Sequence, residues 1–259
     1  MQSMKTLRIL LCFFLTSTYC WSQTHYGSPE KNPFSLQNNF QNWYKYQSSN
    51  IMLSMDFIGL DVKKKSINKE LFFQKLNSGN YIPIRLVPND TLVYQLFKIV
   101  PIADTSIKAT IMQLAFDEYE HFKMEGKAFP KFDFADINGN VISNETMKGK
   151  YVIIKCWYIH CAACIEEFPE VNQLAAKYKH RDDMLFLSLA EDTSAQLNSF
   201  LAKKPLNYIV IPSMKTYMNQ VLHLNGFPTH FILDKEGKIL KVLSNYESLN
   251  NAIEGLLKD

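Results

Sequence analysis

Three cysteines and a histidine stand close together in the stretch KCWYIHCAAC, residues 155–164. Two alanines separate Cys161 from Cys164, and on a helix this spacing brings both sulfurs onto one face, close enough to bond. Free backbone N–H groups at a helix start stabilise a thiolate, whereas a thiol one turn further in is shielded. We therefore expect a dithiol pair that exchanges disulfides, with the low-pKa thiol at Cys161 and Cys164 able to resolve a mixed disulfide.

Haem, a metal ion and plain core packing are the other uses of such cysteines. Covalent haem attachment requires a histidine after the second cysteine, where this chain has Ile165. A structural zinc site needs four ligands, and the remaining histidines are scattered without pair spacing. Copper held by the two thiolates with His160 as a third ligand, and simple burial of the thiols, stay open as alternatives.

The elements around the pair are a strand and a helix. The run YVIIKCW, residues 151–157, predicts a buried strand, and CIEEFPEVNQLAAKYK, residues 164–179, has apolar residues at helical spacing. Further strands are expected at 184–190 and 208–211, and a strand pair turns at Glu236 and Gly237. Strands that alternate with helices indicate a layered α/β sheet, with the dithiol where the first strand gives way to a helix.

The preceding part of the chain carries no motif with evident chemistry. Residues 23–50 are polar, with scattered Pro, Gly, Ser and Asn, and predict a loosely ordered lead-in. Residues 51–126 alternate strand-like runs with two helical segments, one capped by Asn68 and one closed by Gly126. We expect a small α+β module there.

The N-terminus has the pattern of an export signal. Lys5 and Arg8 precede a seven-residue apolar run, and Ser22 follows as a small residue for cleavage. That run is too short for a bilayer, which takes roughly 20 apolar residues, so residues 1–22 are predicted to be a removable signal peptide without a membrane span. The protein would then act in the periplasm or cell envelope. The formal charge of +3 comes without a long basic block, so no nucleic-acid partner is expected.

From about residue 127 to the C-terminus, the chain resembles the TlpA/ResA-like thiol-disulfide oxidoreductases. The stretch FPKFDFADINGNVIS, the CxxC motif followed by EEFPEVNQL, and the later GFPTHFILDKEGKI carry this resemblance. It implies a thioredoxin-like three-layer α/β/α sandwich with a central mixed sheet over residues 127–259. It also implies that Cys161 attacks, that Cys164 resolves, and that Pro228 is a cis-proline packed against the active disulfide.

A cis-proline would turn the backbone of Phe227 toward the sulfurs, where its polar groups could pair with an extended substrate segment. Together with Phe227, we assign Thr229 and Trp157 to the substrate-binding region.

Four residues mark departures or matches within the motif. His160 stands where relatives carry Trp, and it either stabilises the Cys161 thiolate or only lines the groove. Lys155 stands where thioredoxins carry a buried Asp, and it cannot do a carboxylate's work. Glu167 matches a carboxylate of ResA-type proteins and is our candidate for taking the proton of the buried thiol. Cys156 shares a face with Val152 and Ile154 by strand alternation, which predicts a buried, inert thiol.

These observations predict an exported protein-disulfide oxidoreductase, acting as a reductase because relatives of this type mostly are. It would need no cofactor besides the Cys161–Cys164 pair. Its partners would be disulfide-containing or dithiol proteins, together with an upstream thiol electron donor. Two alternatives of other classes stay open: a non-catalytic thioredoxin-fold binding module and a copper metallochaperone.

Overall fold

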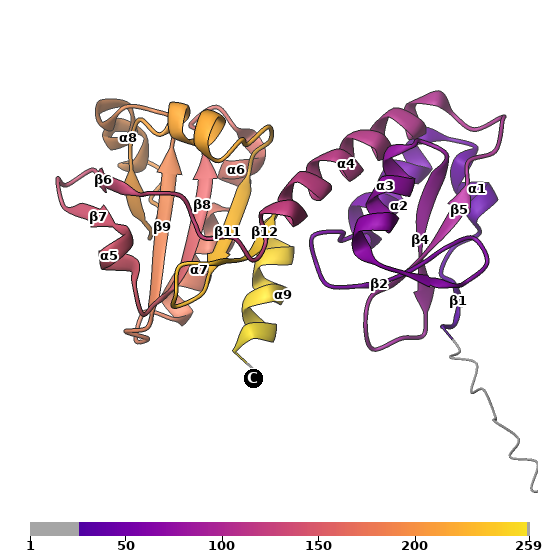
Figure 1. Ribbon diagram of the computed structural model, residues 1–259. Helices are drawn as coiled ribbons and strands as arrows, with labels where there is room; N and C mark the ends of the chain where they lie inside the picture. The colour runs from indigo at the N-terminus through magenta and orange to yellow at the C-terminus, as the bar shows by residue number, and fades with distance from the viewer. Residues whose placement is uncertain (1–25, 258–259) are drawn as a thin grey trace, which may run out of the picture.

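Alternating residues of the strand β8 (Tyr151–Trp157) divide the C-terminal half of the protein into two cores. The computed structural model describes residues 26–257 (Figure 1). Val152 and Cys156 face one core, whereas Ile153 and Trp157 face the other. A strand that is apolar on both faces must be covered on both, so the sheet lies between two layers.

The central sheet has the order β10-β9-β8-β11-β12. Strands β9 and β10 run parallel to β8, whereas β11 and β12 add antiparallel pairs on the other side. The predicted fold class, a thioredoxin-like sandwich with a mixed central sheet, is confirmed. The bounds of the strands that join β8 are β9 (Met184–Ala190), β10 (Ile209–Ile211), β11 (Thr229–Leu233) and β12 (Ile239–Leu243).

Helices cover both faces of this sheet, and a small hairpin precedes them. Residues of α7, α8 and α9 enter the core that contains Trp157, and residues of α5 and a π-helical turn, η1, enter the opposite one. The elements are β6 (Asp133–Ala135), β7 (Val141–Ser143), α5 (Asn144–Met147), α6 (Ala162–Glu166), α7 (Phe168–Lys177), α8 (Ser194–Leu201), η1 (Tyr217–Val221) and α9 (Tyr246–Leu256).

The helix expected across residues 164–179 is broken. Helix α6 ends at Glu166 and α7 begins at Phe168, with Pro169 in its first turn. Proline has no N–H to donate to the preceding turn and its ring clashes with that turn's carbonyl, so a continuous helix is disfavoured. The break leaves Glu167 at the junction, which matters for the site below.

The N-terminal half forms a second five-stranded sheet with the order β1-β4-β5-β2-β3. Asn68 caps α3 through its side chain, as predicted, by accepting from the N–H of Leu71 at 2.8 Å. The bounds are β1 (Ser28–Pro29), α1 (Pro33–Gln37), α2 (Phe40–Asn50), β2 (Ile58–Leu60), β3 (Ser66–Ile67), α3 (Lys69–Asn77), β4 (Tyr81–Val87), β5 (Val93–Lys98) and α4 (Thr105–Met124).

The expectation of a loosely ordered lead-in at residues 23–50 is wrong for the part that the structure describes. Helices α1 and α2 occupy much of it, capped by Asn32 and Asn39. Trp43 is fully buried and Tyr46 nearly so, both in the core of the N-terminal half. Burial of large aromatic side chains outweighs the polar composition of the segment. The predicted signal peptide, residues 1–22, lies outside the described residues.

Helix α4 connects the two halves (Figure 1). Ile107, Ile111 and Ala115 pack into the N-terminal core, and later residues of the helix contact β12 of the C-terminal sheet. Within residues 26–257, no helix has the length and apolar character needed to cross a bilayer.

Candidate active site

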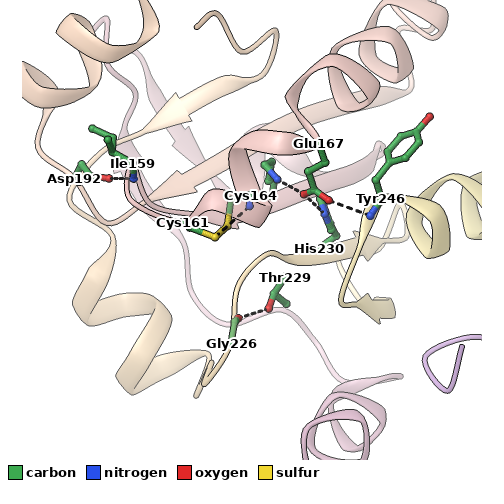
Figure 2. Close-up of a disulfide and its surroundings, with 10 residues drawn as sticks. Ile159, Cys161, Cys164, Glu167, Asp192, Gly226, Thr229, His230 and Tyr246 are labelled. Carbon is green, nitrogen blue, oxygen red and sulfur yellow. Dashed lines mark hydrogen bonds and ion pairs between the residues drawn. A yellow bond between two sulfur atoms is a disulfide. The ribbon is translucent and has the colours of Figure 1, made fainter. Parts of the chain in front are cut away.

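Cys161 and Cys164 form a disulfide at the start of α6 (Figure 2). Cys161 is the N-cap residue, and its Sγ accepts a hydrogen bond from the N–H of Cys164 at 3.2 Å. Cys161 is 6% exposed, whereas Cys164 is fully buried. Of the two residues, only Cys161 therefore offers a surface from which an incoming nucleophile or substrate can approach the disulfide.

The loop Gly226–Thr229 faces this disulfide (Figure 2). The peptide bond between Phe227 and Pro228 is cis, as the resemblance implied. The Thr229 hydroxyl donates to the carbonyl of Gly226 at 2.7 Å and closes the loop on itself. Within residues 26–257 no hydrogen bond engages the backbone of Phe227, so its N–H and carbonyl are free for an extended chain.

The assignment of Trp157 to substrate binding is wrong. Trp157 is fully buried, and its indole N–H donates to the hydroxyl of Ser188 at 3.1 Å. Its ring packs edge-on against Phe168 at 5.0 Å between centroids. Trp157 thus supports α7, the helix that follows the dithiol turn, from inside the core.

The segment before Cys161 is held in place by its backbone. The N–H of Ile159 donates to the carboxylate of Asp192 at 2.8 Å, a contact that joins two strand ends (Figure 2). His160 is exposed, and its ring makes no hydrogen bond within the described part of the chain. Asp192 was not singled out from the sequence, since an acidic residue after a strand carries no signal of its own.

Three ionisable side chains meet beside the disulfide. The fully buried Lys155 forms an ion pair with Glu167, and His230 Nε2 lies 2.8 Å from the same carboxylate oxygen. The second oxygen of Glu167 accepts from the backbone N–H of Tyr246 at 3.1 Å (Figure 2). Glu167 therefore receives three donors, from β8, β11 and the start of α9.

The fold explains why these three groups meet. Lys155 and His230 stand directly opposite each other in the β8–β11 register. The break between α6 and α7 places Glu167 above that pair. His230 was missed by the motif reasoning. The available signal was a polar residue inside an apolar strand: His230 stands within the run THFIL, and Lys155 is the one charged residue within YVIIKCW.

The electrostatics of this cluster favour an ion pair beside a neutral imidazole. Burial lowers the pKa of Lys155, and the Glu167 carboxylate opposes that effect. Burial alone would raise the pKa of Glu167, but the hydrogen bond to His230 and the charge of Lys155 outweigh it and lower that pKa. Burial lowers the pKa of His230, which favours an imidazole with its proton on Nε2. The other ring nitrogen, Nδ1, is buried without a partner in the described residues.

Cys156 lies on the opposite face of the sheet. It is fully buried in the core with Val152 and Ile154, whereas Cys161 and Cys164 belong to the other core. Burial raises the pKa of the Cys156 thiol well above its ordinary value. The expected face and burial are confirmed, and the sheet separates this thiol from the disulfide.

Metal-ligating side chains do not gather beside the disulfide within residues 26–257. No three His, Cys, Asp or Glu side chains in that range are arranged to hold a metal ion. The arrangement offers a disulfide that can be approached from the side of Cys161, a shielded Cys164, a buried cluster of ionisable groups and a free stretch of backbone.

Comparison with known proteins finds relatives for the C-terminal half of the chain. The model of the family described as Redoxin matches residues 124–256. The chain is 28% identical to the thiol-disulfide oxidoreductase ResA of Bacillus cereus, over 58% of this chain and 85% of that protein. It is 26% identical to the thioredoxin-like protein YneN of Bacillus subtilis, over 44% of this chain and 68% of that protein. Among solved structures, the thioredoxin domain of a thiol-disulfide oxidoreductase from Bacteroides vulgatus shows 21% identity and a TM-score of 0.47, covering 51% of this chain and 96% of that one.

Proposed function

Since this chain belongs to the Redoxin family and is a thiol-disulfide oxidoreductase, we propose that it is exported and reduces disulfides in partner proteins through Cys161 and Cys164. One observation carries the proposal: a Cys161–Cys164 disulfide, with Cys161 as its only partly exposed residue, lies in the same core as Phe227, whose backbone is unengaged in the described residues. The direction, reduction, follows the resemblance to TlpA/ResA-like proteins.

The reaction is two successive exchanges in the reduced protein. The Cys161 thiolate attacks one sulfur of the partner's disulfide, so a mixed disulfide forms and the other partner sulfur leaves as a thiolate that takes a proton. The Cys164 thiolate then attacks Sγ of Cys161 and releases the second partner thiol. The partner gains two electrons and two protons, and the protein ends with the Cys161–Cys164 disulfide, which an external thiol donor must reduce.

Cys164 must lose its proton before the second exchange. We assign the acceptor to the cluster around Glu167, because this residue stands at the junction that directly follows α6, three positions after Cys164. His160, exposed beside Cys161, is assigned the minor role of stabilising the attacking thiolate. The backbone of Phe227 holds the substrate segment in an extended conformation, while Thr229 fixes the loop that presents it.

A trapping experiment tests the proposal. Cys164→Ser removes the resolving thiol, so reduced protein should accumulate a mixed disulfide with its partner through Cys161, visible on a non-reducing gel and lost on adding dithiothreitol. Cys156→Ser is the matched control, because its sulfur lies behind the sheet, and it should behave as wild type. No adduct in Cys164→Ser, together with no reduction of insulin disulfides by wild type, would refute the enzymatic role.

Direction and export each need their own measurement. Equilibration of the Cys161–Cys164 pair with a glutathione redox buffer should give a potential more negative than that of glutathione for a reductase, and a more positive one would refute that direction. Mass spectrometry of the protein from its native host should find Gln23 as the first residue, which checks removal of the predicted signal peptide.

A further inference from the structure

A cavity of about 200 Å³ lies beside the Gly226–Thr229 loop, between it and helix α4. The N-terminal half supplies one wall through α4, and the cis-proline loop with Ser244 supplies the other. Cavities that hold cofactors or drug-sized molecules measure roughly 300–1,000 Å³, so this one suits a single side chain. It adjoins Phe227, whose free backbone is the proposed path of the substrate.

The walls of this cavity are acidic. Asp117, Glu118 and Glu120 line it from α4, and no Lys or Arg lines it among the described residues, although Glu120 is paired with Lys123 at 2.6 Å. His121 also lines the cavity, and burial lowers the pKa of this histidine, which favours its neutral form. The charge of the walls therefore favours a cation.

One carboxylate oxygen of Glu118 is left without a donor. Glu118 is only 5% exposed, and its Oε1 accepts from the hydroxyl of Ser244 at 2.7 Å. Its Oε2 is buried with no hydrogen-bond partner in the described chain, and Nδ1 of His121, three residues further along the helix, is equally unpartnered. Burial raises the pKa of Glu118 to about 7, so an incoming cation would draw this carboxyl into its charged form. A buried carboxylate oxygen without a donor is costly, and a positively charged donor would relieve it.

We propose that this cavity is a specificity pocket that receives a Lys or Arg side chain of the substrate polypeptide, close to the disulfide under attack, with Glu118 as the binding carboxylate. The inference rests on the proposed function, because it takes the substrate to be an extended chain along Phe227. Successive side chains of such a chain point to opposite sides, so one near the reacting cysteine reaches the pocket. The N-terminal half thereby gains a role, since its α4 selects the substrate.

A metal site and a purely structural contact would each behave differently from a specificity pocket. A metal ion would need three ligands, and residues 26–257 contain no such group here. A Glu118 that only bonds Ser244 across the two halves would give no preference among substrates. The experiment therefore measures preference rather than activity alone.

The first assay compares three disulfide-linked peptides that differ at one position beside the cysteine: Lys, norleucine or Glu. Reduced wild type should reduce the Lys peptide at least about tenfold faster than the norleucine peptide, the ratio expected for one charge-assisted hydrogen bond, and the Glu peptide slowest. In Glu118→Gln this ratio should fall to near one. Glu236→Gln makes the same chemical change in an exposed hairpin turn and should keep the wild-type ratio.

Equal wild-type rates for the Lys and norleucine peptides would overturn the proposal, as would an unchanged ratio in a folded Glu118→Gln. The wild-type comparison needs no variant, so it decides the question even where Glu118→Gln does not fold. A second assay separates binding from chemistry: fluorescence anisotropy of labelled peptides in which Ser replaces Cys, titrated with the oxidised protein. Tighter binding of the Lys peptide without reduction of any peptide would refute the reductase function alone. Reduction of all peptides at one rate with equal binding would refute the pocket alone.

Discussion

Removal of the negative charge at Glu167 should leave the buried Lys155 without its ion-pair partner. Lys155 is fully buried, and Glu167 is its ion-pair partner among the described residues. Glu167→Gln keeps the size of the side chain and loses its charge. We expect it to lower the free energy of unfolding by about 3–5 kcal/mol, the usual cost of leaving one member of a buried pair unpaired.

The reverse variant should cost less, because Glu167 has other donors. In Lys155→Met, Glu167 keeps the hydrogen bond to His230 at 2.8 Å and the N–H of Tyr246 at 3.1 Å. Only the lysine contact is lost, about 1.5–3 kcal/mol for a hydrogen bond between charged groups. The double variant should be less destabilised than the sum of the two single ones, because no unpaired lysine charge is left inside the protein.

The pH dependence of the free energy of unfolding tests this reasoning more directly than the stability at a single pH. In the unfolded chain Lys155 has its ordinary pKa of about 10.4. In the folded protein burial lowers this pKa and the Glu167 carboxylate opposes the lowering, so in Glu167→Gln the pKa of folded Lys155 falls further. The unfolded state then binds more protons, so stability should rise with pH by up to about 1.4 kcal/mol per unit on the alkaline side, ending near that pKa. In the wild type, the lowered pKa of Glu167 contributes stability that is present above about pH 4.3 and is lost as pH falls through the folded value.

Urea denaturation from pH 3 to 10, followed by tryptophan fluorescence, measures both dependences on pH, and Trp157 reports on the core beside the cluster. Lys155→Met is the matched control, since it has no lysine to titrate at this position. Equal destabilisation by both single variants, with the same slope against pH, would show that Lys155 does not depend on Glu167 and would refute the reasoning.

Two further predictions concern other buried residues. Cys156→Ser should leave disulfide reduction unchanged and lower the free energy of unfolding by about 1–3 kcal/mol, because it buries a hydroxyl among apolar neighbours. In the folded wild type the Cys156 thiol should resist Ellman's reagent. Rapid labelling of Cys156 would contradict its burial and raised pKa. Trp43→Ala should lower the stability of the N-terminal half by about 3–5 kcal/mol in calorimetry, because Trp43 is fully buried in that core. A change below about 1 kcal/mol would show instead that residues 26–50 are only loosely attached.

Features set by neighbours along the chain were predicted well. The strand Tyr151–Trp157, the helix start at the dithiol, the N-cap at Asn68 and the face of Cys156 all depend on residues within a few positions of one another. Helical and strand periods convert such short spacings directly into geometry. The break at Glu167 was readable in principle from Pro169, whereas α1 and α2 were missed because polar composition hid their buried aromatic residues.

The sequence by itself determined the chemistry of this protein: two sulfurs three positions apart at a strand-to-helix junction, which local geometry places within bonding distance. The tertiary structure decided the surroundings of that pair. Glu167 and His230 are 63 positions apart, and Glu118 and Ser244 are 126 apart. No local period relates residues at such separations, so sheet register and the packing of α4 on β12 determine which charges are paired and which carboxylate is left open.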